Sequence, residues 1–179
     1  MNKQFGLTLV ELMVTLAVLG VLMGIAAPSF VQLIASSNLT SQMNSFYADT
    51  RYARGEAVKR GVDVSLCPSS TSMDADPTCS GSDWKVGWIV FIDTNGNGAR
   101  STTASDGEAI LRRQEQLTGS NSVQGSTAVS SIRYNSDGRV AGGAANLVFT
   151  APNSATADRT VCISMTGKVR VLDKGSSTC

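Results

Sequence analysis

The residue types on which most enzymes and metal sites depend set the first limit on the chemistry of this protein. The 179-residue sequence contains no histidine, which excludes Ser-His triads and Cys-His dyads and removes the commonest zinc ligand. Aspartate and serine are plentiful, but no group of them has catalytic spacing. We therefore expect neither an enzyme nor a bound cofactor.

The cysteines are the next candidates for chemistry, and they are Cys67, Cys79, Cys162 and Cys179. Their spacing contains no C-x-x-C pair, which argues against a metal site. In a domain outside the cytosol, disulfides are the natural alternative. Pairing Cys67 with Cys79 and Cys162 with Cys179 closes the shorter loops, and we prefer it to the other connectivities. Each bond would stabilise the fold by roughly 3 kcal/mol, while free thiols are the other interpretation.

The stretch DTNGNG resembles the opening of an EF-hand calcium loop. Asp93, Asn95 and Asn97 have the spacing of calcium ligands, and Gly98 occupies the turn position. Ala104 stands where the bidentate glutamate should be, so the sequence predicts at most a weak site. Asn-Gly repeats are equally typical of a tight loop after a strand.

Basic residues outnumber acidic ones near the C-terminal end, although the whole chain has a net charge of only +1. From Ser131 onward the cations are Arg133, Arg139, Arg159, Lys168, Arg170 and Lys174, against the anions Asp137, Asp158 and Asp173. In a strand, Lys168 and Arg170 point the same way, roughly 7 Å apart, and could span neighbouring phosphates. The plainer interpretation is two solvated charges beside a hairpin turn.

Glu11 is the one charge in the apolar run from Leu7 to Ala27. As a helix this run would span roughly 30 Å, the thickness of a bilayer core, where an unpaired carboxylate costs on the order of 3 kcal/mol or more. The run is longer than the apolar part of a cleaved secretory signal. A cut after Gly6 would place a new α-amino group on Leu7, one helical turn from Glu11, where the two charges can neutralise each other.

These residues resemble a known signal. A short basic leader ending in Gly6, the stretch LTLVEL, an apolar helix and Pro28 look like the class III signal of type IV prepilins. The resemblance implies that prepilin peptidase cuts after Gly6 and N-methylates Leu7, which is usually Phe in this family. It also implies that membrane lipid surrounds the helix before assembly, and that Glu11 pairs with the N-terminus of a neighbouring subunit in the filament.

The elements that position these residues are a long helix followed by strands. Apolar residues recur at helical steps through Phe30, Ile34, Met43, Phe46, Tyr47, Ala53, Ala57 and Val58, which predicts an amphipathic helix kinked at Pro28 and ended by Gly61. The runs that favour strands are VDVSLC, WKVGWIVFID, EAILRRQEQL, SSIRYNSDGRVAG, NLVFTAP and RTVCISMTGKVRVL. SDGR and MTGK are typical of hairpin turns, and TGSNSVQGSTAV and SSTSMDADPTCSGS of loops.

The sequence thus predicts an α+β protein in which one long N-terminal helix packs on an antiparallel β-sheet domain. We expect a leader over residues 1–6 and a transmembrane or filament-core helix over 7–27. Its amphipathic continuation should cover 28–61, and the β domain 62–179. A type IV pilin-like fold is what the prepilin resemblance implies for this arrangement.

The β half narrows the resemblance. ADTRYARGEAVKRG, VSLCP, GWIVFIDTNGNG, IRYNSDGRV and ISMTGKVRV resemble minor pilins of the FimT/FimU type and the related pseudopilin H of type II secretion. GKVR, Gly167 to Arg170, resembles the G-R-x-R motif with which FimT-type members bind DNA in natural transformation, with Lys168 replacing the first Arg.

The resemblance leaves three functions open: a structural minor pilin, a DNA receptor on a pilus, and a pseudopilin of a secretion machine. It implies other major and minor pilins or pseudopilins as partners, and double-stranded DNA bound with weak sequence preference as a further one. It implies a single-pass protein of the bacterial inner membrane with a periplasmic C-terminal domain, which later enters a pilus or pseudopilus.

Overall fold

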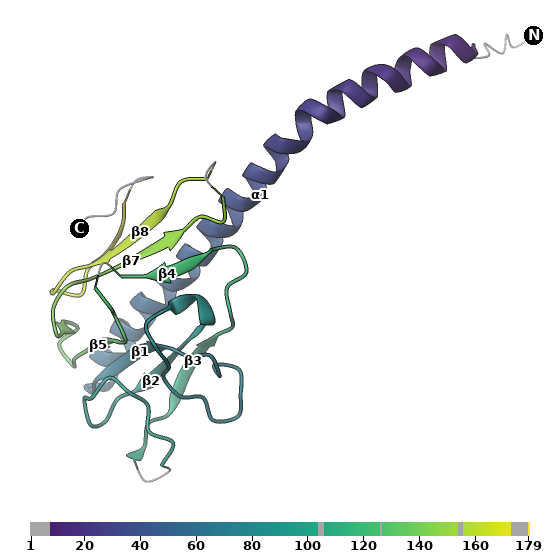
Figure 1. Ribbon diagram of the computed structural model, residues 1–179. Coiled ribbons are helices and arrows are strands. Elements are labelled where there is room, and N and C mark those ends of the chain that lie inside the picture. Colours follow the sequence, from purple (N-terminus) through teal and green to yellow (C-terminus); the bar gives the residue numbers. More distant parts are fainter. Residues whose placement is uncertain (1–7, 104–105, 126, 154–155, 173–178) are drawn as a thin grey trace, which may run out of the picture.

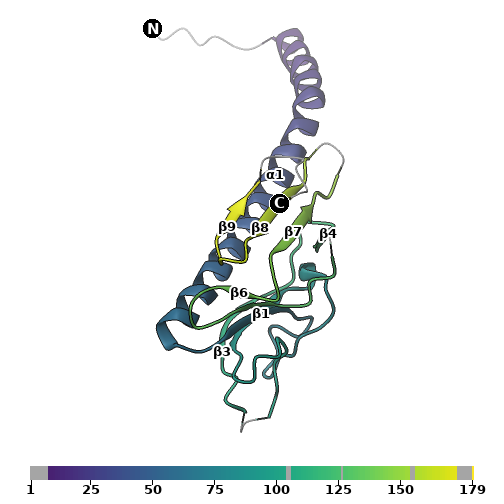
Figure 2. The ribbon, with the colours of Figure 1, turned by 90° about the vertical axis from the view of Figure 1, so that its left-hand side faces the viewer.

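One helix dominates the architecture. The computed structural model describes residues 8–103, 106–125, 127–153, 156–172 and 179, and within helix α1 it leaves the side chains of 25–28 undescribed. Helix α1 spans Leu9–Arg60, and position 28, where a kink was predicted, lies inside this continuous helix. Figures 1 and 2 show the helix bending between its projecting half and the half on the β domain.

Both ends of α1 are capped. The Thr8 hydroxyl accepts from the Glu11 amide, and the Glu11 carboxylate accepts from the Thr8 amide, which is a capping box. At the other end, Gly61 adopts the left-handed conformation with φ of 69° and donates to the Ala57 carbonyl. Because a residue with a Cβ resists this conformation, the predicted stop at Gly61 is confirmed.

The two halves of α1 have different surroundings. Every described side chain from Thr8 to Gly24 is exposed, and α1 is long and apolar enough to cross a membrane. Figure 1 shows this half projecting away from the strands. The buried face begins at Leu39 and continues through Met43, Phe46, Ala53 and Ala57. The predicted apolar stripe was therefore wrong at Phe30, Ile34 and Val58, which are exposed: helical spacing alone does not say where the β domain begins to cover the helix.

The strands form two antiparallel sheets. The five-stranded sheet has the order β3-β2-β1-β5-β6 and the four-stranded sheet the order β4-β7-β8-β9. The strands of the first sheet are β1 (Val64–Pro68), β2 (Trp88–Ile92), β3 (Ile110–Gln114), β5 (Ile132–Tyr134) and β6 (Val140–Ala141). Those of the second are β4 (Ser122–Gln124), β7 (Ala145–Thr150), β8 (Arg159–Ile163) and β9 (Val169–Val171). The α+β prediction is confirmed, and the β domain consists of two sheets.

Two segments differ from the prediction. Trp84–Val86 forms the short 3-10 helix η1 instead of the start of a strand, because the Asp83 side chain caps it by accepting from the Lys85 amide. The predicted loop over 118–129 contains β4, where Val123 is fully buried opposite Phe149. Strand β4 contains only one buried apolar residue, so the sequence showed no alternating pattern from which a strand could be predicted.

The core lies where α1 crosses both sheets. The Phe46 ring meets the Trp84, Trp88 and Phe149 rings edge-on, with centroids 5.4, 5.3 and 5.9 Å away. Edge-to-face contacts at this spacing are favourable. Figure 2 shows β8 and β9 running beside α1, and this contact positions the C-terminal hairpin against the helix.

Candidate functional site

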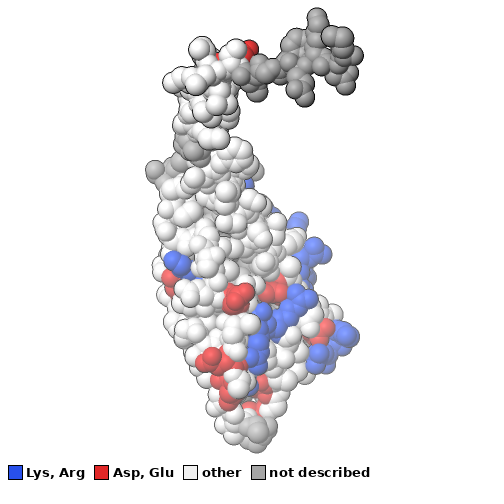
Figure 3. All heavy atoms as spheres, turned by 90° about the vertical axis from the view of Figure 1, so that its right-hand side faces the viewer, with Lys and Arg blue, Asp and Glu red and all other residues white. Residues whose placement is uncertain are grey.

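The projecting half of α1 carries one carboxylate. The sequence has no other charged residue between positions 8 and 48, and Figure 3 shows a single acidic patch near the end of the projecting helix. Glu11 Oε2 accepts from the Thr8 amide at 3.0 Å and from its hydroxyl at 2.9 Å. Gly6 and Leu7 lie outside the described residues. The described partners of Glu11 are therefore those of the capping box.

The second candidate region is the β8–β9 hairpin, whose turn runs from Ser164 to Lys168. Gly167 has φ of 77° and donates to the Ser164 carbonyl. The β5–β6 turn has the same character, because Gly138 has φ of 76° and donates to the Asn135 carbonyl. The predictions that MTGK and SDGR form hairpin turns are thus confirmed.

The structure packs these two turns together. The Val140 amide donates to the Met165 carbonyl at 3.0 Å, and a Cβ on Gly167 would collide with the Gly138 carbonyl oxygen. Arg139, in the β5–β6 turn, therefore lies in the neighbourhood of Lys168, although far from it in the sequence.

The predicted cations separate into two groups. Lys168 and Arg170 are exposed on the hairpin, and Arg170 lies opposite Cys162 in the strand register. Arg159 begins β8, at the end of the strand away from the turn, and Lys174 lies outside the described residues. Lys168 and Arg170 thus lie on the β8–β9 hairpin and the exposed Arg139 on the neighbouring β5–β6 turn, beside the exposed Asp137, while Arg159 is at the far end of β8.

A groove runs between α1 and this hairpin. It has a volume of about 610 Å³ and is lined by Tyr47, Arg51, Arg54, Gly55, Val58, Lys59, Gly167, Lys168 and Val169. We call it the cationic groove, because four of these residues are basic and none is acidic. Arg54 Nη1 donates to the Gly167 carbonyl at 3.2 Å and joins the two walls. The helical wall was not predicted from the sequence, although Tyr47, Arg51, Arg54 and Val58 follow one another at helical steps.

The charges beside the groove are unequally compensated. Glu56 accepts from Arg60 Nε at 2.5 Å and lies 3.8 Å from Lys59 Nζ. The hydrogen bond from Arg60 lowers the pKa of Glu56, so this carboxylate is ionised at neutral pH. Within the described part of the chain, Arg51, Arg54 and Lys168 form no ion pair. The Arg51 guanidinium lies instead over the Tyr47 ring, 5.6 Å from its centroid.

Two disulfides brace the β domain. Cys67 bonds to Cys79 and Cys162 to Cys179, with Cα–Cα distances of 5.5 and 5.7 Å. This is the connectivity that we preferred from the sequence. The second disulfide ties residue 179 to Cys162 of β8. Cys162 is the residue that lies opposite Arg170 in the strand register.

The DTNGNG loop satisfies its own carboxylate. Asp93 is buried, and its oxygens accept from the amides of Asn97 and Gly98 and from the Ser65 hydroxyl. Asn95 donates to Glu108 instead. Among the described residues, no group of three or more His, Cys, Asp or Glu side chains gathers as metal sites require, and Ala104 lies outside them. Both carboxylate oxygens of Asp93 thus accept hydrogen bonds from within the domain.

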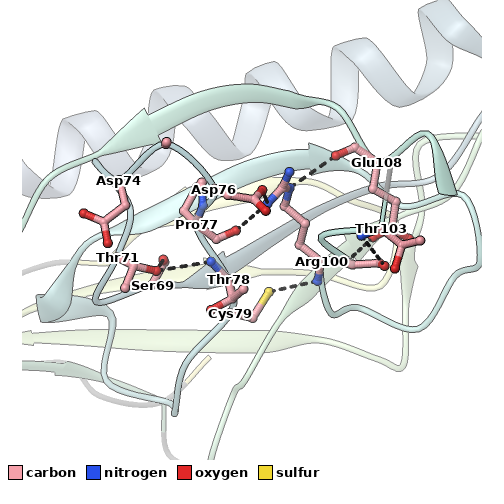
Figure 4. A network of polar contacts seen from close by, with 12 residues as sticks. Ser69, Thr71, Asp74, Asp76, Pro77, Thr78, Cys79, Arg100, Thr103 and Glu108 are labelled. Carbon is pink, nitrogen blue, oxygen red and sulfur yellow. Dashed lines mark hydrogen bonds and ion pairs between the residues drawn. The ribbon is translucent and has the colours of Figure 1, made fainter. Parts of the chain in front are cut away.

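A polar network ties this loop to the first disulfide (Figure 4). Arg100 donates from Nη1 to the Asp76 carboxylate at 2.6 Å and to the Pro77 carbonyl at 2.7 Å, and from Nε to the Glu108 carbonyl at 3.3 Å. Its amide donates to the Cys79 sulfur at 3.3 Å. This network joins the loop that contains Asp76 and Cys79 to the loop that contains Arg100 and Glu108, although none of these four residues lies in a helix or a strand.

Comparisons with known proteins agree with this architecture. Residues 42–167 match the family described as type II transport protein GspH, and residues 1–27 match the prokaryotic N-terminal methylation motif. Fimbrial protein Q of Moraxella bovis is 30% identical over 116 residues, which cover 62% of this chain and 71% of that protein.

Solved structures show the same fold. The type IV minor pilin FimU of Pseudomonas aeruginosa superposes with a TM-score of 0.56 at 16% identity, covering 84% of this chain and 95% of that one. The minor pseudopilin EpsH from the type 2 secretion system of Vibrio cholerae gives 0.51 at 15% identity, covering 75% and 96%. The matched proteins are structural subunits, and none is an enzyme.

Proposed function

Because this chain belongs to the GspH family of type IV minor pilins and pseudopilins, we propose that it is a minor pilin that helps to assemble or initiate a type IV pilus. The observation that carries the proposal is the half of α1 that is apolar and exposed on every side. Such a surface needs lipid before assembly and other helices afterwards. Its partners are other major and minor pilins.

The N-terminal signal supports a processing route. In this proposal prepilin peptidase cleaves after Gly6 and methylates Leu7. The match of residues 1–27 to the N-terminal methylation motif supports both steps. Before assembly the subunit is a single-pass protein of the inner membrane, with its disulfide-bonded domain in the periplasm, where disulfides persist. Glu11 then neutralises the N-terminus of a neighbouring subunit.

Replacing Glu11 tests this assembly role. Glu11→Ala should be processed and inserted in the membrane at normal levels, because the apolar helix is unchanged, but it should be lost from filaments. Immunoblots of sheared filaments and of membranes measure both pools. Glu115→Ala removes an exposed carboxylate from the β domain and is the matched control. Normal amounts of Glu11→Ala in sheared filaments would contradict the role.

The family also contains secretion subunits, so a minor pseudopilin of a type II secretion system is the alternative. The fimbrial relative supports the pilus, and the description of the matched family supports secretion. Deleting the gene separates the two functions. Loss of surface pili with normal protein secretion supports the pilus, and the reverse result supports the pseudopilin.

A second function is DNA binding through the β8–β9 hairpin, as in uptake during natural transformation. Lys168 and Arg170 are exposed and form no ion pair with another described residue, which favours it, and Gly167 shapes the turn that presents them. The hairpin offers charge without a base-reading pattern, so binding to double-stranded DNA should depend weakly on sequence.

A salt titration tests this binding. The full-length chain in nonionic detergent should bind a short duplex with an affinity that falls as salt rises, by about 0.9 in log–log slope for each phosphate contact. Lys168→Ala/Arg170→Ala should reduce the slope by about two units. Arg113→Ala, in the other sheet, should leave it unchanged. If the wild-type chain does not bind even at low salt, the DNA function is wrong.

A further inference from the structure

We propose that the phosphate backbone of DNA lies in the cationic groove, with α1 supplying one wall of contacts and the β8–β9 hairpin the other. The inference rests on the DNA binding proposed above and specifies where on the surface the backbone is bound. It adds two contacts, Arg51 and Arg54, which lie on α1 and are not part of the GKVR hairpin.

The charges of the groove select an anion. Among the described residues that line it, four side chains are basic and none is acidic. Glu56 partly compensates Lys59, but Arg51, Arg54 and Lys168 form no ion pair within the described residues. Uncompensated cations on facing walls attract phosphates and release counterions on binding.

The walls are held in place before any ligand arrives. Arg54 uses one guanidinium nitrogen to bond the Gly167 carbonyl at 3.2 Å, and an arginine has further donors for a phosphate. Arg51 is exposed and rests over the Tyr47 ring. Arg54 is therefore positioned before binding, which reduces the entropy lost when it contacts a phosphate.

Gly55 lies in the helical wall of the groove. It lies within α1, where a glycine costs about 1 kcal/mol relative to alanine, and it has no packing reason to be there, because an added Cβ would meet no atom within 4 Å. Its position in the lining provides a reason: a side chain here would fill space that the backbone of a ligand needs.

Two variants test the helical wall, one by charge and one by shape. The full-length chain in nonionic detergent is titrated with a short fluorescent duplex over a range of salt. Arg51→Ala should reduce the log–log salt slope by about 0.9, the amount for one phosphate contact. Gly55→Leu adds bulk without charge and should weaken binding about tenfold near 0.1 M salt, which one lost contact would also do.

Each variant has a matched control outside the groove. Arg113→Ala takes one exposed cation from the other sheet, and Ser41→Leu adds the same bulk at an exposed position of α1 outside the groove. Neither should change the affinity or the slope. Circular dichroism of each variant shows that the fold is intact.

The outcomes separate this inference from the hairpin function. If Arg51→Ala and Gly55→Leu weaken binding and the controls do not, the groove holds the backbone. If only Lys168→Ala/Arg170→Ala weakens binding, the groove inference is overturned while the hairpin function stands. If the wild-type chain binds no DNA at low salt, both are overturned. If Arg51→Ala and Arg113→Ala have equal effects, the binding follows net charge and the groove inference fails.

Discussion

At the scale of single residues, Gly167 shows how an absent side chain shapes the proposed binding surface. Its φ of 77° is one that residues with a Cβ resist. A Cβ here would collide with the Gly138 carbonyl oxygen and lie 3.0 Å from Arg54 Nε. Glycine at this position therefore permits both the contact between the hairpin turns and the bond from Arg54.

We predict that Gly167→Ala destabilises the protein more than the conformation alone explains. Gly142→Ala is the control, because Gly142 has φ of 87° but open space around it. The control should lower the free energy of unfolding by about 1–2 kcal/mol, and Gly167→Ala by about 3 kcal/mol or more, since the backbone must also move. Urea denaturation measures both. Equal losses would show that the turn contact contributes nothing to stability.

At the scale of elements, Asp49 connects α1 to the five-stranded sheet. This buried carboxylate accepts from Trp88 Nε1 at 3.0 Å and from Arg112 Nη1 at 2.8 Å. The hydrogen bond to Asp49 raises the pKa of Arg112, whose guanidinium also lies 3.9 Å from the centroid of the Tyr52 ring. One side chain on the helix thus anchors two neighbouring strands, β2 and β3.

Removing this carboxylate should be costly. Asp49→Ala leaves the buried Trp88 N–H without its acceptor and Arg112 without its ion pair, which together cost about 3 kcal/mol of unfolding free energy. Asp63→Ala is the control, because Asp63 pairs with Arg133 at 3.7 Å while both side chains are about 30% exposed. It should cost under about 1 kcal/mol. Thermal denaturation compares the two variants, and a larger loss for Asp63→Ala would contradict the assigned role.

At the scale of the whole molecule, the chain divides into a projecting apolar rod and a folded domain. Figure 1 shows the rod leaving the domain without contact to the strands, and the buried face of α1 begins only at Leu39. The half of α1 that stabilises the domain is therefore different from the half for which we propose a role in assembly. The domain does not need the rod to bury its core.

A truncation tests this division. A version that begins at Ser36 should be a water-soluble monomer with the unfolding free energy of the full chain, which itself needs detergent. A version that begins at Asn44 lacks the buried Leu39 and Met43 and should lose about 4 kcal/mol. Ultracentrifugation and urea denaturation measure association and stability. Aggregation of the longer version would show that the domain depends on the rod.

Local features of the sequence were sufficient to predict much of this fold. The glycine that ends α1, the SDGR and MTGK turns and the disulfide connectivity all follow from short-range chemistry, since each depends on neighbouring residues or on the shortest loop. The start of the strand at Trp88 and the short strand around Val123 did not follow. Both features depend on burial against segments that are distant in the sequence, and such burial leaves no periodic pattern of apolar residues in the local sequence.

The division into an apolar helix that carries Glu11 and a strand-rich domain could be predicted before folding, because hydropathy and periodicity depend only on the order of residues along the chain. The set of cations that lie beside one another is visible only once the chain is folded. Arg54 and Gly167 are 113 residues apart, and the packing of β8 and β9 along α1 brings them into contact. Which charges face each other across a groove depends on how the helix and the sheets pack. That packing depends on contacts throughout the core, so it cannot be read from any short stretch of sequence.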